Sequence, residues 1–360
     1  MSNVTIIGAG MMGTGITRPI LDNGHRVRLV GTHLDREIID SVKMTRMHPT
    51  LHRQIPEEIQ ALQIEDVDSA VAEAPIVVCG VSSFGIPWFA ENIIPKLNPG
   101  TTVVAITKGL NSYPDGRLEP FPYYLESLRS DLNFVAVGGP CICFELFDRR
   151  HTMVCYCGSN MDKVKEIKSQ FETGYYHIYP TTDVIGVETG VAMKNAYAMG
   201  VSLAVGLAER EKGITDASHI TDNCVPGAPD LNPIYNPQAA LFAQSCIEMR
   251  RLIALLGGNK DFASGLPCAG DLYVTVFGGR TRRLGTLLGR GMPYTEVKKV
   301  LSGVTLEAVA IITRVAEAVR IRAKKGETEL KYFPLLIHMD SILNQNQPVK
   351  LDWKAFGEFY

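Results

Sequence analysis

The chain has 360 residues, of which 46% are hydrophobic and 21% charged, and its formal net charge is −2 at pH 7. This balance is typical of a globular protein with large cores, and it argues against general disorder, nucleic-acid binding and binding to an anionic membrane surface. At roughly 150 residues per domain, the length predicts two domains.

The beginning of the chain has no secretory pattern, because its first three residues lead directly into VTIIGAG. No run of residues approaches the ~20 apolar positions that span a bilayer. The eight cysteines are scattered, and the C-x-C pairs Cys141/Cys143 and Cys155/Cys157 have no histidine nearby. We therefore expect buried, reduced thiols, no metal site and a cytoplasmic location.

The first half of the chain alternates short β-branched runs with helical patterns. Strands are predicted at 3–7, 26–30, 76–81, 101–107, 134–139 and 152–157, and helices at 86–97 and 162–172. Apolar strands that alternate with helices indicate an α/β fold, a doubly wound, largely parallel sheet of the Rossmann type. Pro19 lies inside the helix expected after the first strand and predicts a kink or an early end there.

After residue 183 the pattern becomes helical. Helices are predicted at 184–210, 237–256, 294–301, 306–324 and 333–343. The segment 219–238 is rich in proline, asparagine and aspartate and predicts a long loop, a kind of segment that is often functional. We expect a dinucleotide-binding Rossmann domain over 1–183 and an all-helical substrate and catalytic domain over 184–360.

The first predicted strand ends in GAGMMG, which places Gly8, Gly10 and Gly13 in the G-x-G-x-x-G register. Such glycines permit a tight turn, the close approach of a pyrophosphate and the packing of helix on strand, while N–H groups at the helix start bind phosphate. We predict a dinucleotide site here that includes Met11 and Met12. A purely structural glycine turn is the alternative.

The type of nicotinamide cofactor, NAD or NADP, stays open. An acid at the end of the second strand would bind a ribose 2′-hydroxyl, whereas an arginine nearby would suit a 2′-phosphate. That strand ends as VGTH at 30–33, and the first acid, Asp35, is followed by Arg36. The missing acid slightly favours NADP, with Thr32 and Arg36 as cofactor residues; an exposed loop without a ligand is the alternative.

Three further segments hold charged residues in apolar surroundings. ITKGL places Lys108 at the carboxyl end of a predicted strand, where open α/β sheets bind ligands. VAMKNAYAMG places Lys194 in an apolar helix, where its charge needs solvent or a partner. CAGDLYVTVFGGRTRRLG places Asp271 ahead of Arg280. Each has an ordinary structural explanation alone, but together they indicate an anion site that faces a dinucleotide.

Over nearly its whole length the chain resembles the NAD(P)-dependent sn-glycerol-3-phosphate dehydrogenase family, within the 6-phosphogluconate dehydrogenase-like superfamily. GAGMMGTG resembles the family's cofactor turn, ITKGL its lysine-glycine segment and VGGPCICFEL its Gly-Pro segment. VAMKN resembles the segment of its catalytic lysine, and AGDLYVTVFGGRTRR the segment of its substrate-phosphate arginine. The resemblance implies a homodimeric enzyme that transfers a hydride between NAD(P) and sn-glycerol 3-phosphate, or a close phosphorylated polyol, forming dihydroxyacetone phosphate or the matching ketone.

The resemblance also implies a role for each matching residue. Lys194 would stabilise or protonate the developing alkoxide, Lys108 would be a second cation, and Asp271 would orient Lys194. Free lysine has a pKa of ~10.4, so its surroundings would have to lower the pKa for proton transfer near neutrality. The implied substrate-binding residues are Asn195, Thr275, Arg280 and Thr281. The implied cofactor residues beyond the glycine turn are Thr32, Arg36, Ser82, Lys108, Arg280 and Glu307.

Several positions depart from the family pattern. Thr281 stands where the family has asparagine, Val81-Ser82 where it has Val-Pro, and Glu307-Ala308 where it has Glu-Gly. They suggest a diverged dehydrogenase or one for a larger phosphorylated polyol. Two alternatives remain: a related hydroxyacid or sugar-acid dehydrogenase with the same two domains, and a non-catalytic NAD(P) sensor, against which the intact lysines argue.

Overall fold

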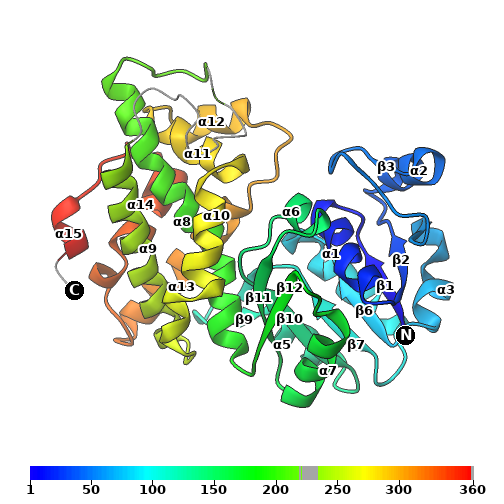
Figure 1. Cartoon of the computed structure of the whole chain (residues 1–360). Coiled ribbons are helices and arrows are strands. Elements are labelled where there is room, and N and C mark those ends of the chain that lie inside the picture. The colour runs from blue at the N-terminus through cyan, green and yellow to red at the C-terminus, as the bar shows by residue number, and fades with distance from the viewer. Residues whose placement is uncertain (219, 221–233, 358–360) are drawn as a thin grey trace. The chain divides into compact units, whose positions relative to one another are not determined.

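The computed structural model describes residues 1–218, 220 and 234–357 (Figure 1). Most of the predicted 219–238 loop therefore lies outside the described residues. The chain divides into two compact units. The first consists of Met1–Lys108 and Pro120–Glu188, and the second of Gly109–Glu119 and Thr189–Tyr360.

An eight-stranded sheet forms the centre of the first unit. Its order is β12 (Tyr176–Thr181), β11 (Thr152–Cys157), β10 (Asn133–Gly138), β7 (Thr102–Ala105), β6 (Ile76–Cys79), β1 (Asn3–Ile7), β2 (Arg26–Val30) and β5 (Gln60–Leu62). Neighbouring strands are parallel except β10 and β11. The predicted Rossmann-type, largely parallel sheet is confirmed, and the six predicted strands are all present.

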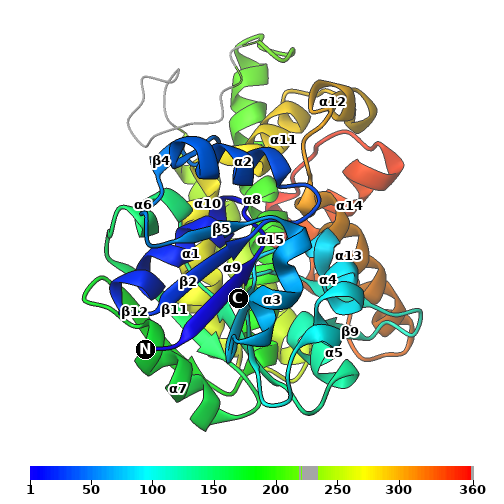
Figure 2. The ribbon, with the colours of Figure 1, turned by 90° about the vertical axis from the view of Figure 1, so that its right-hand side faces the viewer.

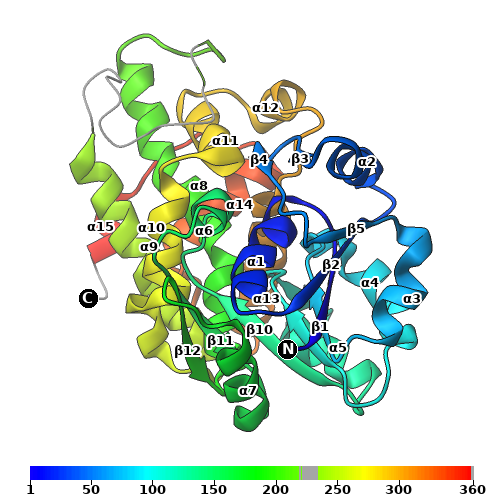
Figure 3. The ribbon, with the colours of Figure 1, turned by 45° about the vertical axis from the view of Figure 1, so that its right-hand side comes forward.

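Helices cover both faces of this sheet (Figures 2 and 3). One face carries α1 (Met11–Asp22), α6 (Cys143–Phe147) and α7 (Met161–Phe171); the other carries α3 (Val67–Ala72), α4 (Ile86–Asn92) and α5 (Phe121–Leu128). The expectation that Pro19 ends α1 early is wrong, because the helix continues to Asp22. Ile16 and Ile20 of α1 are fully buried in the core of this unit, and that packing outweighs one lost backbone hydrogen bond.

Two small hairpins were not predicted. β3 (Met47–His48) pairs with β4 (Arg53–Gln54) after α2 (Arg36–Thr45). β8 (Leu110–Ser112) and β9 (Leu118–Pro120) form the other. Strands of two or three residues are too short to show alternation in a sequence.

The second unit is helical. Its helices are α8 (Val184–Glu211, whose first five residues belong to the first unit), α9 (Tyr235–Leu255), α10 (Asp271–Val276), α11 (Gly279–Gly289), α12 (Tyr294–Val300), α13 (Glu307–Lys324), α14 (Pro334–Gln345) and α15 (Trp353–Gly357). The five predicted helices are present with ends within two residues of the prediction. By length and composition alone α8 could cross a membrane, but 78% of its most apolar stretch is buried inside the structure, as in a core helix.

Helices α8 and α11 pack with their main chains in contact. A Cβ atom on Gly206 of α8 would overlap the carbonyl oxygen of Thr286, and one on Gly285 of α11 would overlap that of Met199. Glycine is therefore required at these crossing points, because any side chain would push the two helices apart.

Helix α14 begins on a buried carboxylate. Glu248 of α9 is fully buried, and its Oε1 accepts hydrogen bonds from Leu335 N at 2.8 Å and Gln244 Nε2 at 2.7 Å. Its Oε2 accepts from Leu336 N at 2.9 Å and from the Tyr197 hydroxyl at 3.0 Å. Burial raises the pKa of Glu248 to about 7, although the four donors act in the opposite direction. One side chain thus satisfies two N–H groups of the first turn of α14.

Candidate active site

The glycine turn has the geometry that a dinucleotide requires. Gly8 has φ +109°, and a Cβ there would lie 2.8 Å from the oxygen of Gly80 on the neighbouring strand connection. A Cβ on Gly13 would overlap the oxygen of Gly8, so α1 starts directly against the end of β1. A Cβ on Gly10, by contrast, would have open space within 4 Å. The turn is tight where it packs and open where a pyrophosphate would approach.

The residues after β2 contact the glycine turn. The carboxylate of Asp35 accepts hydrogen bonds from Ala9 N at 3.1 Å, Thr32 N at 2.8 Å and Thr32 Oγ1 at 2.8 Å. The first acid after β2 is therefore turned towards the glycine turn. Arg36 is half exposed and forms an ion pair with Glu65, from which it would have to turn to bind a 2′-phosphate.

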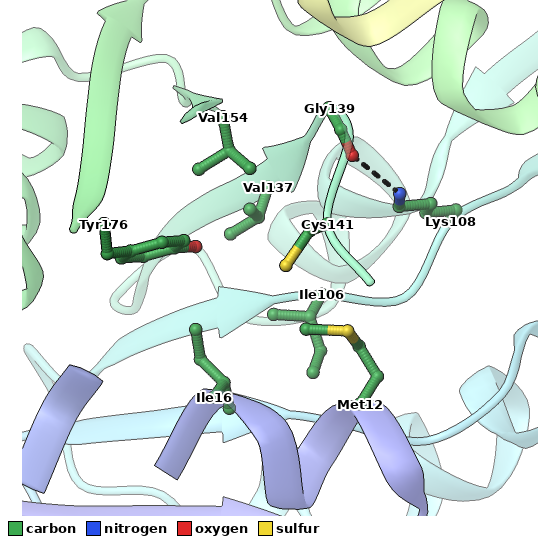
Figure 4. Close-up of a pocket in the computed structure, with 9 residues that line it drawn as sticks. All are labelled: Met12, Ile16, Ile106, Lys108, Val137, Gly139, Cys141, Val154 and Tyr176. Carbon is green, nitrogen blue, oxygen red and sulfur yellow. Dashed lines mark hydrogen bonds between the residues drawn. The ribbon is translucent and has the colours of Figure 1, made fainter. Parts of the chain in front are cut away.

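Lys108 lies beyond the end of β7 and borders a pocket in the first unit (Figure 4). Its Nζ lies 3.4 Å from the carbonyl oxygen of Gly139, so it donates there weakly. The cavity measures about 20 Å³, which is enough for one water molecule. Met12 of α1 and the thiol of Cys141 border the same pocket, which links Lys108 to the helix that follows the glycine turn.

Glu188 was not predicted as a site residue. It is fully buried in the first unit, and neither carboxyl oxygen has a hydrogen-bond partner within the described part of the chain. Burial raises its pKa to about 8, while the charge of Lys108 acts in the opposite direction. Sequence reasoning could not find this residue, because the segment VETGV does not show whether the glutamate lies on a buried or an exposed face of its helix.

In the second unit, Lys194 of α8 forms an ion pair with Asp271. Their Nζ and Oδ1 atoms are 2.6 Å apart, and the side chain of Lys194 is 16% exposed while that of Asp271 is fully buried. Asp271 is the first residue of α10, directly after a π-helical turn at Leu266–Gly270. The hydroxyl of Thr275, one turn later, donates to the carbonyl oxygen of Asp271 at 2.6 Å. The predicted contact between the lysine and this aspartate is present.

Asn195 follows Lys194 and contacts the start of α13. Its Nδ2 lies 3.5 Å from an oxygen of Glu307, at the outer limit for a hydrogen bond. Glu307, expected to bind the cofactor, is the first residue of α13 and contacts Asn195, expected to bind the substrate, within the helical unit. Ser82 is exposed in the first unit, beside the strand connection that borders the glycine turn.

The predicted phosphate residues lie at the start of α11. Gly278 is extended and Gly279, the first residue of α11, has φ +81°, so the glycine pair turns the chain into the helix. Arg280 is exposed and Thr281 half buried, both in the first turn of α11. N–H groups and the positive end of the helix dipole favour anions at this position, and an arginine adds a forked donor.

Two family models match the chain, one in its first half and one in its second. Residues 3–164 match the family model described as NAD-dependent glycerol-3-phosphate dehydrogenase N-terminus, and residues 183–353 the model described as its C-terminus. The NADP(+)-dependent glycerol-3-phosphate dehydrogenase of Archaeoglobus fulgidus is 31% identical over 91% of this chain and 92% of its own. The glycerol-3-phosphate dehydrogenase [NAD(P)+] of Clostridium botulinum strain Alaska E43 is 26% identical over 86% of this chain and 85% of its own.

Solved structures show the same fold. The glycerol-3-phosphate dehydrogenase of Coxiella burnetii has a TM-score of 0.74 and 22% identity, and the alignment covers 99% of this chain and 97% of the other. The corresponding protein of Saccharomyces cerevisiae has a TM-score of 0.75 and 17% identity, with 99% and 98% covered.

Proposed function

We propose roles for these residues from one premise: the chain belongs to the NAD-dependent glycerol-3-phosphate dehydrogenase family. It is an NAD(P)-dependent oxidoreductase that acts on the CH–OH group of glycerol 3-phosphate and forms dihydroxyacetone phosphate. The observation that carries a catalytic rather than a sensory role is the Lys194–Asp271 pair, 2.6 Å apart with the carboxylate fully buried. A binding protein without chemistry has no need for a lysine held in this way.

The nicotinamide group, when bound, supplies or accepts the hydride. Lys194 Nζ is proposed to donate the proton to the ketone oxygen during reduction and to take it from the hydroxyl during oxidation. Asp271 keeps Lys194 in place, since a buried carboxylate strongly favours a paired cation. Lys108 is proposed as the second cation, which stabilises negative charge on the oxygen as it develops. Gly10, where a Cβ would meet open space, fits the close approach of the pyrophosphate.

The substrate phosphate is proposed to bind at the first turn of α11. Arg280 offers two parallel N–H donors, and the helix start adds N–H groups of its own. Thr281 can donate one hydroxyl hydrogen bond, whereas the family's asparagine would offer two N–H donors. Asn195 and Thr275 are proposed to contact the remaining oxygens of the substrate.

A cytoplasmic location and a homodimer are also proposed. Five of the seven cysteines within the described residues are buried, which suits the thiols of a reducing compartment. The dimer is proposed from the resemblance to the family alone. Gel filtration coupled to light scattering would measure the mass directly.

The function is tested by a substrate panel. We expect NADH or NADPH oxidation, followed at 340 nm, with dihydroxyacetone phosphate, and kcat/KM at least 100-fold lower with unphosphorylated dihydroxyacetone, since a charged phosphate contact contributes about 3 kcal/mol. Three- to five-carbon phosphorylated ketones and a keto acid complete the panel. Equal or better activity with unphosphorylated compounds would contradict the proposal and favour a related hydroxyacid dehydrogenase.

Arg280 gives a second test. Arg280→Ala is expected to raise KM for glycerol 3-phosphate about 100-fold with little change in stability, because the side chain is exposed. Arg280→Lys keeps the charge but loses the forked pair of donors, so its KM should lie between those of the wild type and Arg280→Ala. The control is Arg250→Ala, an exposed arginine on α9. An unchanged KM in Arg280→Ala would remove this residue from phosphate binding.

A further inference from the structure

Ala9, the residue between the first two glycines of the turn, is held at both ends by side chains from distant segments. It is fully buried. Its N–H donates to Asp35 Oδ2 at 3.1 Å, and its carbonyl oxygen lies 2.8 Å from His48 Nε2. The hydroxyl of Thr14 in α1 also donates to this carbonyl oxygen, at 3.1 Å. The backbone of one residue in the cofactor turn therefore has three side-chain contacts.

The contacts of His48 define its tautomer. This histidine is fully buried in β3, and its Nδ1 lies 3.0 Å from Leu51 N and 3.3 Å from Thr50 N. Backbone N–H groups can only donate, so Nδ1 is the acceptor and the proton of the neutral ring is on Nε2. Nε2–H therefore donates to the oxygen of Ala9, and the ring links the β3–β4 hairpin to the glycine turn.

Asp35 acts from the other side. The same oxygen that accepts from Ala9 N also accepts from the N–H and the hydroxyl of Thr32, which follows β2. Asp35 precedes α2, so it ties the end of β2 and the start of α2 to the turn. One oxygen of its carboxylate, Oδ2, thus accepts all three of these hydrogen bonds.

We propose that His48 and Asp35 are positioning residues for the dinucleotide: they hold Ala9 from both ends and so fix the orientation of the first-turn N–H groups of α1. The inference rests on the proposed function in that the glycine turn is taken as the cofactor site. By this proposal, His48 and Asp35, which lie outside the glycine motif, contribute part of the affinity for the cofactor.

The pH dependence has a definite sign. Burial lowers the pKa of His48 below its usual 6.5, whereas the hydrogen bond to Ala9 and the charge of Asp35 favour the protonated ring and His52 disfavours it. Protonation would place a second N–H on Nδ1, directly against the N–H of Leu51, and break the hairpin contact, while Nε2–H would still donate to Ala9. The contact between His48 and the hairpin is therefore complete above pH 6.5 and weakens as pH falls below 6.5 towards the lowered pKa of His48, but the contact with Ala9 remains.

The test compares variants that keep one half of the histidine contact. His48→Asn keeps an acceptor near the Leu51 N–H and loses the donor to Ala9, whereas His48→Gln has the reach to keep the donor. His52→Asn is the control, because His52 is exposed, close in sequence and in a left-handed conformation that asparagine tolerates. The dissociation constants of NADH and NADPH are measured by fluorescence between pH 5 and 8, together with KM for glycerol 3-phosphate at saturating cofactor.

We expect His48→Asn to weaken cofactor binding about tenfold at pH 7.5, as for the loss of one buried hydrogen bond. Binding should be largely recovered in His48→Gln, and KM for glycerol 3-phosphate should not change. If His48→Asn does not fold, Asp35→Asn replaces it and should also weaken binding. Unchanged cofactor binding, or equal loss in the Asn and Gln variants, would overturn the inference. No binding of NADH or NADPH by the wild type would instead overturn the proposed function.

Discussion

Lys194→Ala is expected to lower kcat by about 1,000-fold while NADH and NADPH still bind, because it removes the proposed proton donor of the reaction and leaves the glycine turn intact. Lys194 lies in the helical unit, whereas the glycine turn lies in the first unit. The measurements are kcat under saturating substrate and the dissociation constants of both cofactors. Turnover within tenfold of the wild type would exclude Lys194 as the acid.

Stability has to be separated from chemistry in this experiment. Asp271 is fully buried, so removing Lys194 takes away the cation that pairs with it and is expected to cost about 3 kcal/mol of unfolding free energy. Lys194→Arg is the matched variant, because it keeps a cation opposite Asp271 but cannot give up a proton near neutral pH. We expect Lys194→Arg to be nearly as stable as the wild type and nearly as inactive as Lys194→Ala. An active Lys194→Arg would show that only the charge is needed.

Glu248→Ala should lower the unfolding free energy by about 4 kcal/mol, which would be the largest effect on stability outside the active site. The substitution leaves the N–H groups of Leu335 and Leu336 and the hydroxyl of Tyr197 without their acceptor in a buried place. It also leaves a cavity, because Glu248 has no exposed surface. Helix α14 should therefore lose its start.

Urea unfolding followed by circular dichroism measures this effect. Arg250→Ala, two residues later on the exposed side of α9, is the control and should change the unfolding free energy by less than about 0.5 kcal/mol. Hydrogen exchange should show the faster exchange confined first to the beginning of α14. A loss below about 1 kcal/mol in Glu248→Ala would mean that water replaces the carboxylate at little cost.

Local patterns predicted much of the fold. The central strands are continuous apolar runs and the long helices have clear periodicity, so both were found with small errors at the ends. The two edge strands were missed for physical reasons. β5 has three residues, and β12 carries Pro180, which only an edge strand accepts.

The candidate site divides in the same way. The glycine motif is local, and its three glycines have the backbone environments that the motif predicts. Lys194 and Asp271 are 77 residues apart, and their pairing followed from the family resemblance, since no spacing rule reaches that far. His48 lies 39 residues from Ala9, and no sequence pattern around a histidine in a short hairpin indicates such a distant contact. The sequence shows Asp35 as the first acid after β2, but its contact with Ala9 depends on how the chain folds.

The main-chain contact between α8 and α11 affects which substrates the helical unit can accept. Lys194 belongs to α8 and Arg280 to the first turn of α11, and no layer of side chains lies between these helices at Gly206 and Gly285 to take up a shift. The span between the proposed proton donor and the proposed phosphate ligand is thus a fixed length, set by backbone atoms. We therefore expect the enzyme to select ketones by the number of bonds between the carbonyl and the phosphate. Exchanging Thr281 or its neighbours would change the contacts with the phosphate, but not the distance between the two helices.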